Sequence, residues 1–268
     1  MKILFCLNRD IYCHNILNHF LKTIENDEIK IYFSNGVGIT PDFADLNLLK
    51  FYEQVLPFNK IFPLLEKTFQ AEKKLDEQSF LTFDQISKIH SLEILNFQNI
   101  NKDGLEYLKL WQPDLIISVR FGQIFKGEII NLPKHGIINL HSGILPDYRG
   151  IMATFWTMLE EKKQIGSTLH FISDASIDTG DIISVSNLNV DPSKSLIWHI
   201  NSLYKNGGIQ MIDSAIKNFK NNIPINTMKP DLSKSGYFSY PQESDFEKFK
   251  KNYKIFDPFD YYEEVLDL

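Results

Sequence analysis

The stretch GIINLHSGILPDYRG, residues 136–150, combines a short apolar run with polar residues that converge on one place. Its first six residues are mostly β-branched and aliphatic, which predicts a strand. Residues two apart on a strand project from the same face, so Asn139 and His141 should lie together at the carboxyl end of that strand. A loop rich in turn residues follows at once. The stretch therefore predicts two polar side chains presented at the end of a buried strand.

Strands and helices alternate along the chain around this stretch. Residues 103–111 have helical spacing, Pro113 follows as a stop signal, and residues 114–119 form a nearly all-apolar run. Strands are predicted at residues 2–7, 29–33, 92–95, 114–119, 136–141, 167–172 and 181–190. Helices are predicted at residues 11–24, 62–75, 83–90, 103–111, 125–131 and 153–161. This alternation is typical of an α/β fold, with a Rossmann-like, mainly parallel sheet and helices on both faces.

The character of the sequence changes after Pro192. We expect a domain over residues 1–192 and a C-terminal tail over residues 193–268. One long helix is predicted at residues 193–220, with a weak point at the Gly207-Gly208 pair. The remainder of the tail is polar and aromatic, and GYFSYP at residues 236–241 is its strand-like run.

Composition and charge narrow the functional class. The 268 residues are 43% hydrophobic and 23% charged, as expected of a globular protein with an ordinary core. A formal net charge of −6 gives no support to nucleic-acid binding. Cys6 and Cys13 belong to no pattern with zinc-like spacing, and no apolar run is long enough for a signal peptide or a membrane span. We therefore expect a cytoplasmic protein without a metal ion and without a nucleic-acid or membrane partner.

A second stretch, ISDASIDTGDII at residues 172–183, places Asp178 in a turn between two predicted strands. A lone histidine in a strand is usually structural, and an aspartate in a turn usually caps backbone N–H groups. Together, however, Asn139, His141 and Asp178 suit acyl transfer onto an amine. The Asn139 amide and a protonated His141 can donate hydrogen bonds to the negative oxygen of a tetrahedral centre. Asp178 can hold the imidazole and accept the proton that the amine loses.

These residues, in this order, resemble the N10-formyltetrahydrofolate-dependent formyltransferases. The resemblance covers about residues 103–190 and rests on four motifs, at residues 113–125, 139–150, 166–170 and 177–182. It implies that residues 1–192 are the catalytic domain and that N10-formyltetrahydrofolate is the co-substrate. Asn139 and His141 match the pair that stabilises the oxyanion, and Asp178 matches the proton acceptor.

The resemblance also implies which residues contact the folate. They follow the strand at 114–119 or lie in the loop after His141, and they are Phe121, Gly122, Gln123, Ile124, Leu145, Pro146 and Tyr148. Thr168 and His170 share a face of the next predicted strand. For His170, a structural role and a role that supports the site are both open.

Three branches of this family differ in the amine that they formylate. The enzymes that act on methionyl-tRNA carry an RNA-binding domain after the catalytic core. Here the residues from 196 onward hold nine Lys and ten Asp or Glu, a balance of charges that does not favour binding to a phosphate backbone. The enzymes that act on glycinamide ribotide open with a glycine-rich phosphate loop, and this chain has Leu7-Asn8-Arg9-Asp10 instead. The GYFSYP motif is similar to the tail of the third branch, the sugar N-formyltransferases of surface-polysaccharide synthesis, in which a tail hairpin helps to form a homodimer.

We therefore expect a sugar N-formyltransferase that acts on a dTDP-amino-dideoxyhexose, with a lean toward the 4-amino sugar, and a homodimer with a hairpin in the tail. The residues expected to contact this acceptor are Asn8, Arg9, Asp10, Arg149, Tyr237, Phe238 and Tyr240. The two arginines suit a pyrophosphate, the glutamate tail of the donor, or an ordinary ion pair. The aromatic tail residues suit stacking on thymine or packing within a core or interface.

Other functions compete with this interpretation. A methionyl-tRNA formyltransferase-like enzyme is one alternative, and a formyltetrahydrofolate hydrolase, which uses the same three residues, is another. A dinucleotide-binding module would need a glycine-rich turn after the first strand, and residues 7–10 contain no glycine.

Overall fold

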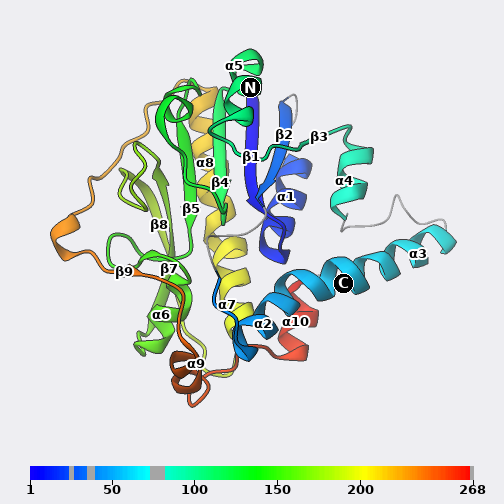
Figure 1. Ribbon diagram of the computed structural model, residues 1–268, viewed down its shortest axis with the longest axis vertical. Coiled ribbons are helices and arrows are strands. Elements are labelled where there is room, and N and C mark those ends of the chain that lie inside the picture. The colour runs from blue at the N-terminus through cyan, green and yellow to red at the C-terminus, as the bar shows by residue number, and fades with distance from the viewer. Residues whose placement is uncertain (24–26, 35–39, 73–81, 266–268) are drawn as a thin grey trace.

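A computed structural model describes residues 1–23, 27–34, 40–72 and 82–265. At its centre lies a seven-stranded sheet with the strand order β3-β2-β1-β4-β5-β7-β8 (Figure 1). The strands are β1 Lys2–Asn8, β2 Glu28–Ser34, β3 Glu93–Leu95, β4 Leu115–Val119, β5 Ile137–His141, β7 Gln164–Phe171 and β8 Ile182–Asn189. The first five strands of this order are parallel, and β7 is antiparallel to both of its neighbours. The predicted α/β fold with a mainly parallel sheet is confirmed.

The side-chain alternation of β1 divides the core into two layers. Ile3, Phe5 and Leu7 point to one face of the sheet, where they pack with residues of α1 Ile11–Thr23, α6 Ala153–Leu159, α7 Leu196–Leu203 and α8 Ile209–Lys220. Leu4 and Cys6 point to the opposite face, toward α5 Asp103–Trp111. All five residues are fully buried. A strand that is apolar on both faces requires cover on both sides, which explains the two helical layers.

Local signals set the helix ends that the sequence predicts well. α1 begins at Ile11 because the Asp10 carboxylate accepts a hydrogen bond from the Cys13 N–H, at 2.9 Å. α5 ends at Trp111, where Gln112 takes a left-handed conformation (φ 54°) and Pro113 follows. The prediction of a helix at residues 103–111 is confirmed, and the predicted helix at 11–24 is confirmed through Thr23.

Residues 44–72 form more helix than predicted. α2 Ala44–Lys50 and α3 Phe62–Glu72 are joined by two π-helical segments, Phe51–Val55 and Pro57–Ile61. Pro57 lacks an N–H and normally ends a helix, so the sequence predicts only the part that begins at residue 62. Wide π-helical turns accommodate such interruptions. Residues 73–75 of the predicted helix lie outside the described residues, and α4 Phe83–Ile89 agrees with the predicted helix at 83–90.

The predicted weak point in the tail helix is confirmed. α7 and α8 are joined by a π-helical turn, Tyr204–Gly208, that passes close to β8. A Cβ atom on Gly207 would lie 1.9 Å from the Ser186 Oγ atom, so only glycine fits at this position. The tail helix therefore widens at the turn where it packs against β8.

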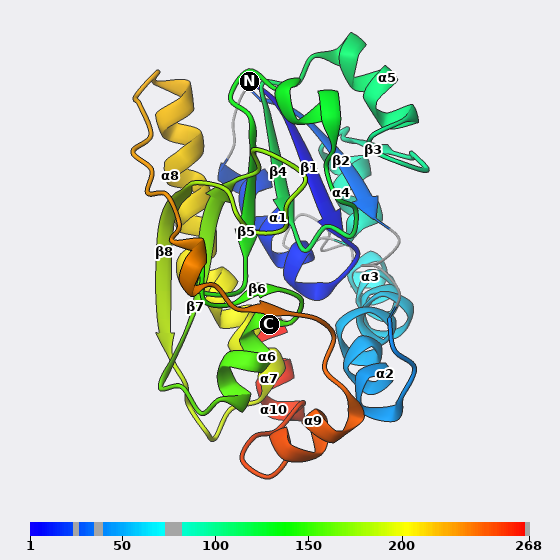
Figure 2. The same ribbon diagram turned by 60° about the vertical axis from the view of Figure 1, so that its left-hand side comes forward.

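The predicted hairpin at residues 236–241 is wrong. The chain after α8 runs past β8 and β7 (Figure 2), and β9 Tyr237–Phe238 pairs in parallel with β6 Arg149–Gly150. The alternation of GYFSYP indicated a strand but not its partner, which lies almost ninety residues earlier in the chain. α9 Glu243–Phe249 and α10 Pro258–Val265 follow, and Phe246 and Tyr261 join the first core layer. The division of the chain at residue 192 stays a prediction.

Within the described ranges, none of the helices has both the length and the apolar character needed to cross a membrane. The carboxyl ends of β1, β4 and β5 meet at one edge of the sheet because these strands are parallel neighbours. In parallel α/β sheets this edge is where ligands bind.

Candidate active site

The strand register brings the predicted polar residues together at this edge. Asn139 and His141 lie two residues apart on β5, and β7 places His170 opposite Asn139 and Thr168 opposite His141. Directly opposed residues of antiparallel strands share one face. Asp178 comes from the segment between β7 and β8, and its left-handed conformation (φ 53°) is one that aspartate tolerates.

The Asp178 carboxylate bridges the two imidazoles. Its Oδ2 atom lies 3.6 Å from Nδ1 of His141, and its Oδ1 atom lies 3.4 Å from Nε2 of His170. The Gly150 N–H donates a hydrogen bond to Oδ2, at 2.8 Å. The three side chains are at most 9% exposed, so this is a buried and charged site.

Main-chain carbonyl groups fix which nitrogen of each imidazole can change its protonation. Nε2 of His141 lies 2.6 Å from the Tyr148 carbonyl oxygen, and Nδ1 of His170 lies 2.9 Å from that of Phe171. A carbonyl oxygen only accepts hydrogen bonds, so both of these nitrogens carry a proton. The nitrogens left to gain or lose a proton, Nδ1 of His141 and Nε2 of His170, are the two that face Asp178.

Asp178 stays ionised because its partners outweigh its burial. Burial alone would raise the pKa of Asp178, but the His141 charge, the His170 hydrogen bond and charge, and the Gly150 N–H hold it well below its usual range. An ionised carboxylate beside a titratable nitrogen can accept a proton from a reacting group.

His170 belongs to the site, which favours the second of its two predicted roles. The Asn139 Nδ2 atom lies 3.1 Å from Nε2 of His170, and Nε2 also faces Asp178. A neutral His170 accepts from Asn139, whereas a charged His170 donates to Asp178. The protonation of His170 thus determines whether one N–H of Asn139 is free.

A second buried charge cluster lies at the carboxyl ends of β1 and β4. Nε of Arg120 lies 2.7 Å from Asp10, and Nη2 lies 3.2 Å from Glu53. The Tyr12 hydroxyl donates to Glu53, at 2.9 Å, and the Asn8 amide donates to Asp10, at 3.1 Å. Burial raises the pKa of Glu53, although the Arg120 charge opposes this. The cluster ties the helical run at 44–72 to the sheet.

Asp10 is bonded within the protein, and its contact with a substrate stays a prediction. Its side chain is fully buried, and both carboxylate oxygens already have partners in Arg120, Asn8 and the Cys13 N–H. Asn8 is 7% exposed and belongs to the same cluster. Arg9, in contrast, is half exposed and lies over the rings of Phe33 and Phe83. Substrate contact by Asn8 and Arg9 stays a prediction.

The predicted folate strip, residues 121–124, is held by β2 and by the turn before α5. The Gly122 N–H donates to Ser34, and the Gln123 side chain bonds with both the Tyr32 hydroxyl and the Ile100 N–H. The Gln123 side chain is therefore structural, which leaves the rings and backbone of the strip for a ligand. Phe121 packs on Tyr32, and Ile124 is 44% exposed.

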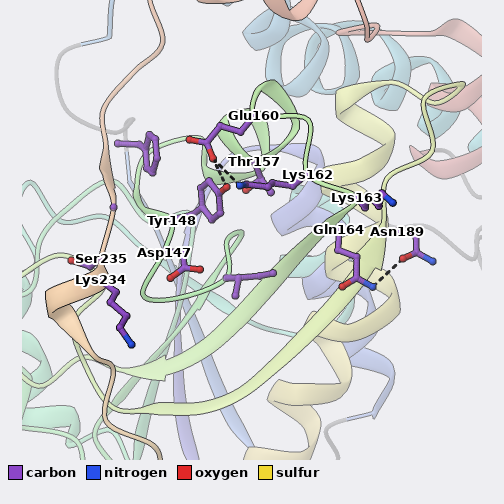
Figure 3. Close-up of a pocket in the computed structure, with 13 residues that line it drawn as sticks. Asp147, Tyr148, Thr157, Glu160, Lys162, Lys163, Gln164, Asn189, Lys234 and Ser235 are labelled. Atoms are coloured by element: carbon purple, nitrogen blue, oxygen red, sulfur yellow. Dashed lines mark hydrogen bonds and ion pairs between the residues drawn. The ribbon is translucent and has the colours of Figure 1, made fainter.

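The loop after His141 is closely packed on its far side. Leu145 is buried, and its N–H donates to Thr168, next to the Leu145–Pro146 peptide. The Tyr148 ring stacks on Phe238, and its hydroxyl donates to Glu160. A groove with a volume of about 930 Å³ lies on this side and is also lined by Lys162, Lys163 and Lys234, which Figure 3 labels. Asn139, His141 and Asp178, which we call the triad, do not line this groove.

The remaining residues that were predicted to contact the acceptor substrate differ in how exposed their side chains are. Tyr237 is 56% exposed, and Tyr240 packs partly against the core. Phe238 lies between Tyr148 and Trp156, with ring centroids 5.4 Å away on each side, so its ring is a packing element. The Arg149 guanidinium is bound within the chain, by the Ile177 carbonyl and Ser235.

Sequence reasoning missed Arg120 and Glu53. A signal for Arg120 was present, because a charge directly after the apolar strand at 115–119 needs a partner. Nothing in the sequence indicated that Glu53 would be that partner. Among the described residues, no group of three or more His, Cys, Asp or Glu side chains is arranged to hold a metal ion.

Comparison with known proteins places these residues in a family. Residues 71–213 match the formyl transferase family. The methionyl-tRNA formyltransferase of Clostridium tetani (strain Massachusetts / E88) is 28% identical over 218 residues, 81% of this chain and 67% of that protein. That of Clostridium novyi (strain NT) is 34% identical over 204 residues, 75% of this chain and 63% of that protein. The chain thus spans about two thirds of the length of these relatives.

Two solved structures share the fold. An N-formyltransferase from Helicobacter canadensis, in complex with folinic acid and dTDP-3-aminofucose, has a TM-score of 0.58 at 18% identity, over 91% of this chain and 72% of that one. A 4-N formyltransferase from Francisella tularensis has a TM-score of 0.58 at 15% identity, over 92% of this chain and 86% of that one. Both likenesses show the fold alone.

The first prediction concerns the ionised state of Asp178. A carboxylate whose pKa is lower in the folded protein stabilises the fold above its unfolded-state value of about 3.9, and this stabilisation is lost as the pH falls through the folded-state value. We expect Asp178→Asn to lower the free energy of unfolding by about 1–3 kcal/mol at pH 7 and by less at pH 3. Urea titrations at both pH values measure this difference.

Asp174→Asn is the matched control for that experiment. Asp174 is an exposed carboxylate of the same segment that accepts a hydrogen bond from the Ser176 N–H, a bond that asparagine can also accept. Its free energy of unfolding should follow the unmodified chain at both pH values. An equal loss at pH 3 and pH 7 for Asp178→Asn would contradict the ionised carboxylate.

The second prediction concerns the Arg120 cluster. Arg120→Ala leaves the Asp10 and Glu53 carboxylates buried without their cation, so we expect a loss of about 3–5 kcal/mol in the free energy of unfolding at pH 7. Arg120→Ala/Glu53→Gln should recover part of this loss, because one of the two stranded charges is removed. Additive effects of the two substitutions in urea unfolding would refute the cluster as an energetic unit.

Proposed function

Because the chain belongs to the formyl transferase family, we propose that it transfers a formyl group from N10-formyltetrahydrofolate to a primary amine. The observation that carries this proposal is the position of Asp178 between His141 and His170, beside Asn139. This set supplies hydrogen-bond donors for an oxyanion and an ionised carboxylate for a proton, within one buried site.

The geometry assigns a role to each side chain. N10-formyltetrahydrofolate supplies the formyl carbon. Nδ1 of a protonated His141 and the Asn139 amide donate hydrogen bonds to the oxygen of that carbon, which becomes negative when the amine adds. Asp178 stabilises the charged imidazole and accepts the proton that the amine loses. The bond between the formyl carbon and N10 of the folate would then break, and this proton would pass to N10 as tetrahydrofolate leaves. The distance of 3.6 Å between Nδ1 of His141 and the Asp178 carboxylate is longer than a hydrogen bond. Catalytic hydrogen bonds often shorten when a reactant binds, and we expect this one to do so.

The residues around the site fit a folate. The rings and backbone at residues 121–124 and the loop at 145–148 would hold it, on either side of the β4–β5 edge. Folate ring systems are flat and aromatic, which suits Phe121. The Asn139 amide, the His141 nitrogen and the Asp178 carboxylate match a formyl group and an amine in hydrogen-bonding character.

Two acceptors are candidates. A dTDP-linked amino-dideoxyhexose is favoured by the acidic net charge of −6, and the half-exposed Arg9 would meet its pyrophosphate. Methionyl-tRNA is favoured by the sequence relatives, and this support is the more direct, since the sugar enzymes share the fold alone. Both acceptors carry phosphates, and either could use the lysines of the groove in Figure 3. A homodimer, as well as a cytoplasmic location, belongs to the same proposal.

A single assay distinguishes these functions. The chain is incubated with N10-formyltetrahydrofolate and, in separate reactions, with dTDP-3-amino- and dTDP-4-amino-dideoxyhexoses and with methionyl-tRNA. We expect one acceptor to gain the mass of one formyl group. His141→Asn and Asp178→Asn should each lower this rate by about 10²–10⁴-fold, because each removes a proton-transfer or charge-stabilising group.

Controls separate catalysis from folding and from hydrolysis. Asp174→Asn should retain the rate of the unmodified chain, since its carboxylate is exposed and outside the site. Release of formate with no formylated acceptor would replace transfer with hydrolysis. A rate that survives both triad substitutions would refute the assigned residues.

A further inference from the structure

One side of the loop that follows β5 is held by a segment far along the chain, residues 235–239, which we call the strap. The strap pairs in register with this loop, Arg149 with Tyr237 and Gly150 with Phe238. The Arg149 N–H donates to the Gly236 carbonyl, at 3.1 Å, and the Ile151 N–H donates to that of Phe238, at 2.9 Å. These bonds fix the backbone of the loop on both sides of Gly150.

Gly150 transmits this restraint to Asp178. Its N–H is the main-chain donor to the Asp178 carboxylate, and its φ of +99° is a conformation that favours glycine. A Cβ atom on Gly150 would lie 2.1 Å from the Phe238 carbonyl oxygen. The strap therefore packs directly on the residue that orients the carboxylate.

The Arg149 side chain connects the loop after β5, the strap and the turn that holds Asp178. Its Nε donates to the Ile177 carbonyl, at 2.9 Å, and Ile177 immediately precedes Asp178. Its Nη1 donates to the Ser235 hydroxyl, at 3.1 Å, and its guanidinium lies 5.8 Å from the centre of the Tyr237 ring. The planar guanidinium holds both contacts in one fixed geometry, which the single ammonium of lysine does not reproduce.

We propose that Arg149 is a positioning residue, which sets the Asp178 turn against the strap, rather than a residue that binds the phosphates of an acceptor. The inference rests on the proposed formyl transfer for its kinetic consequence, but its structural consequence is independent of that function. Arg149 acts on the reacting groups through Ile177 and Gly150. The pairing of β6 and β9, which replaces the predicted hairpin, holds this turn through Gly150.

The kinetic test separates positioning from binding. Arg149→Met keeps a long side chain but removes both donors, so we expect kcat to fall about 10–100-fold while the KM of the acceptor changes less than twofold. The kcat of Arg149→Lys should lie between those of the unmodified chain and Arg149→Met. One ammonium group can donate to Ile177 or to Ser235, but it does not reach both as the guanidinium does. A raised acceptor KM with unchanged kcat would overturn the proposal in favour of phosphate binding.

A second variant protects the test against misfolding. Ser235→Ala removes one contact of Arg149 and leaves the arginine in place, so we expect a smaller fall in kcat of the same kind. Ser233→Ala is its matched control, because Ser233 is exposed and its hydroxyl donates to Asp231 rather than contacting Arg149. Equal kinetics for Ser235→Ala and Ser233→Ala would contradict a strap that acts through Arg149.

A readout without turnover distinguishes failure of this proposal from failure of the proposed function. The carboxyl carbon resonance of Asp178, assigned with Asp178→Asn, is followed by NMR as the pH is lowered from 7 to 3. The unmodified chain should stay ionised through this range, and Arg149→Met should begin to take up the proton within it. His141, His170 and the Gly150 N–H face this carboxylate, and we expect its titration to move toward the usual range when the turn is released. An unchanged Asp178 titration would overturn the positioning role even if no acceptor were formylated.

Discussion

The candidate site depends on one electrostatic constraint: the ionised carboxylate of Asp178 is buried between two imidazoles. An isolated carboxylate would take up a proton rather than remain charged in an apolar interior. Here β5 supplies His141, β7 supplies His170, and the loop after β5 supplies the Gly150 N–H. These three partners come from separate parts of the chain, so the charge is stable only when the sheet, the loop and the strap are all assembled.

The pKa values of two buried carboxylates of this chain are shifted in opposite directions. The pKa of Asp178 is lowered because two imidazoles and a backbone N–H face it. The pKa of Glu53 is raised because burial outweighs the Arg120 charge, which Asp10 shares. Burial alone therefore does not determine the charge of a side chain; the number and kind of donors around it do. This difference keeps Asp178 ionised within the site, whereas Glu53 holds the helical run at 44–72 on the sheet through Arg120 and Tyr12.

Local sequence signals predicted the parts of the structure that local physics controls. The seven strands of the central sheet, the end of α5 at Trp111 and the widening at Gly207 follow from apolar runs, a helix stop and a glycine pair. The convergence of Asn139 and His141 follows from the two-residue period of a strand. The pairing of β9 with β6 and the burial of Glu53 depend on partners far away in the chain. No local pattern specifies such partners, and these are the features that the sequence missed.

The arrangement of the strap explains how one sequence motif can serve a site without contacting a ligand. Arg149 and Phe238 have the composition of a nucleotide-binding surface, a cation beside an aromatic ring. In the fold, however, the guanidinium is occupied by Ile177 and Ser235, and the ring is held between Tyr148 and Trp156. A group whose donors are satisfied within the chain has less to gain from a phosphate, because binding would first break those bonds. Arg9 and Tyr237 keep exposed side chains, so the proposed acceptor contact depends more on them than on Arg149 and Phe238.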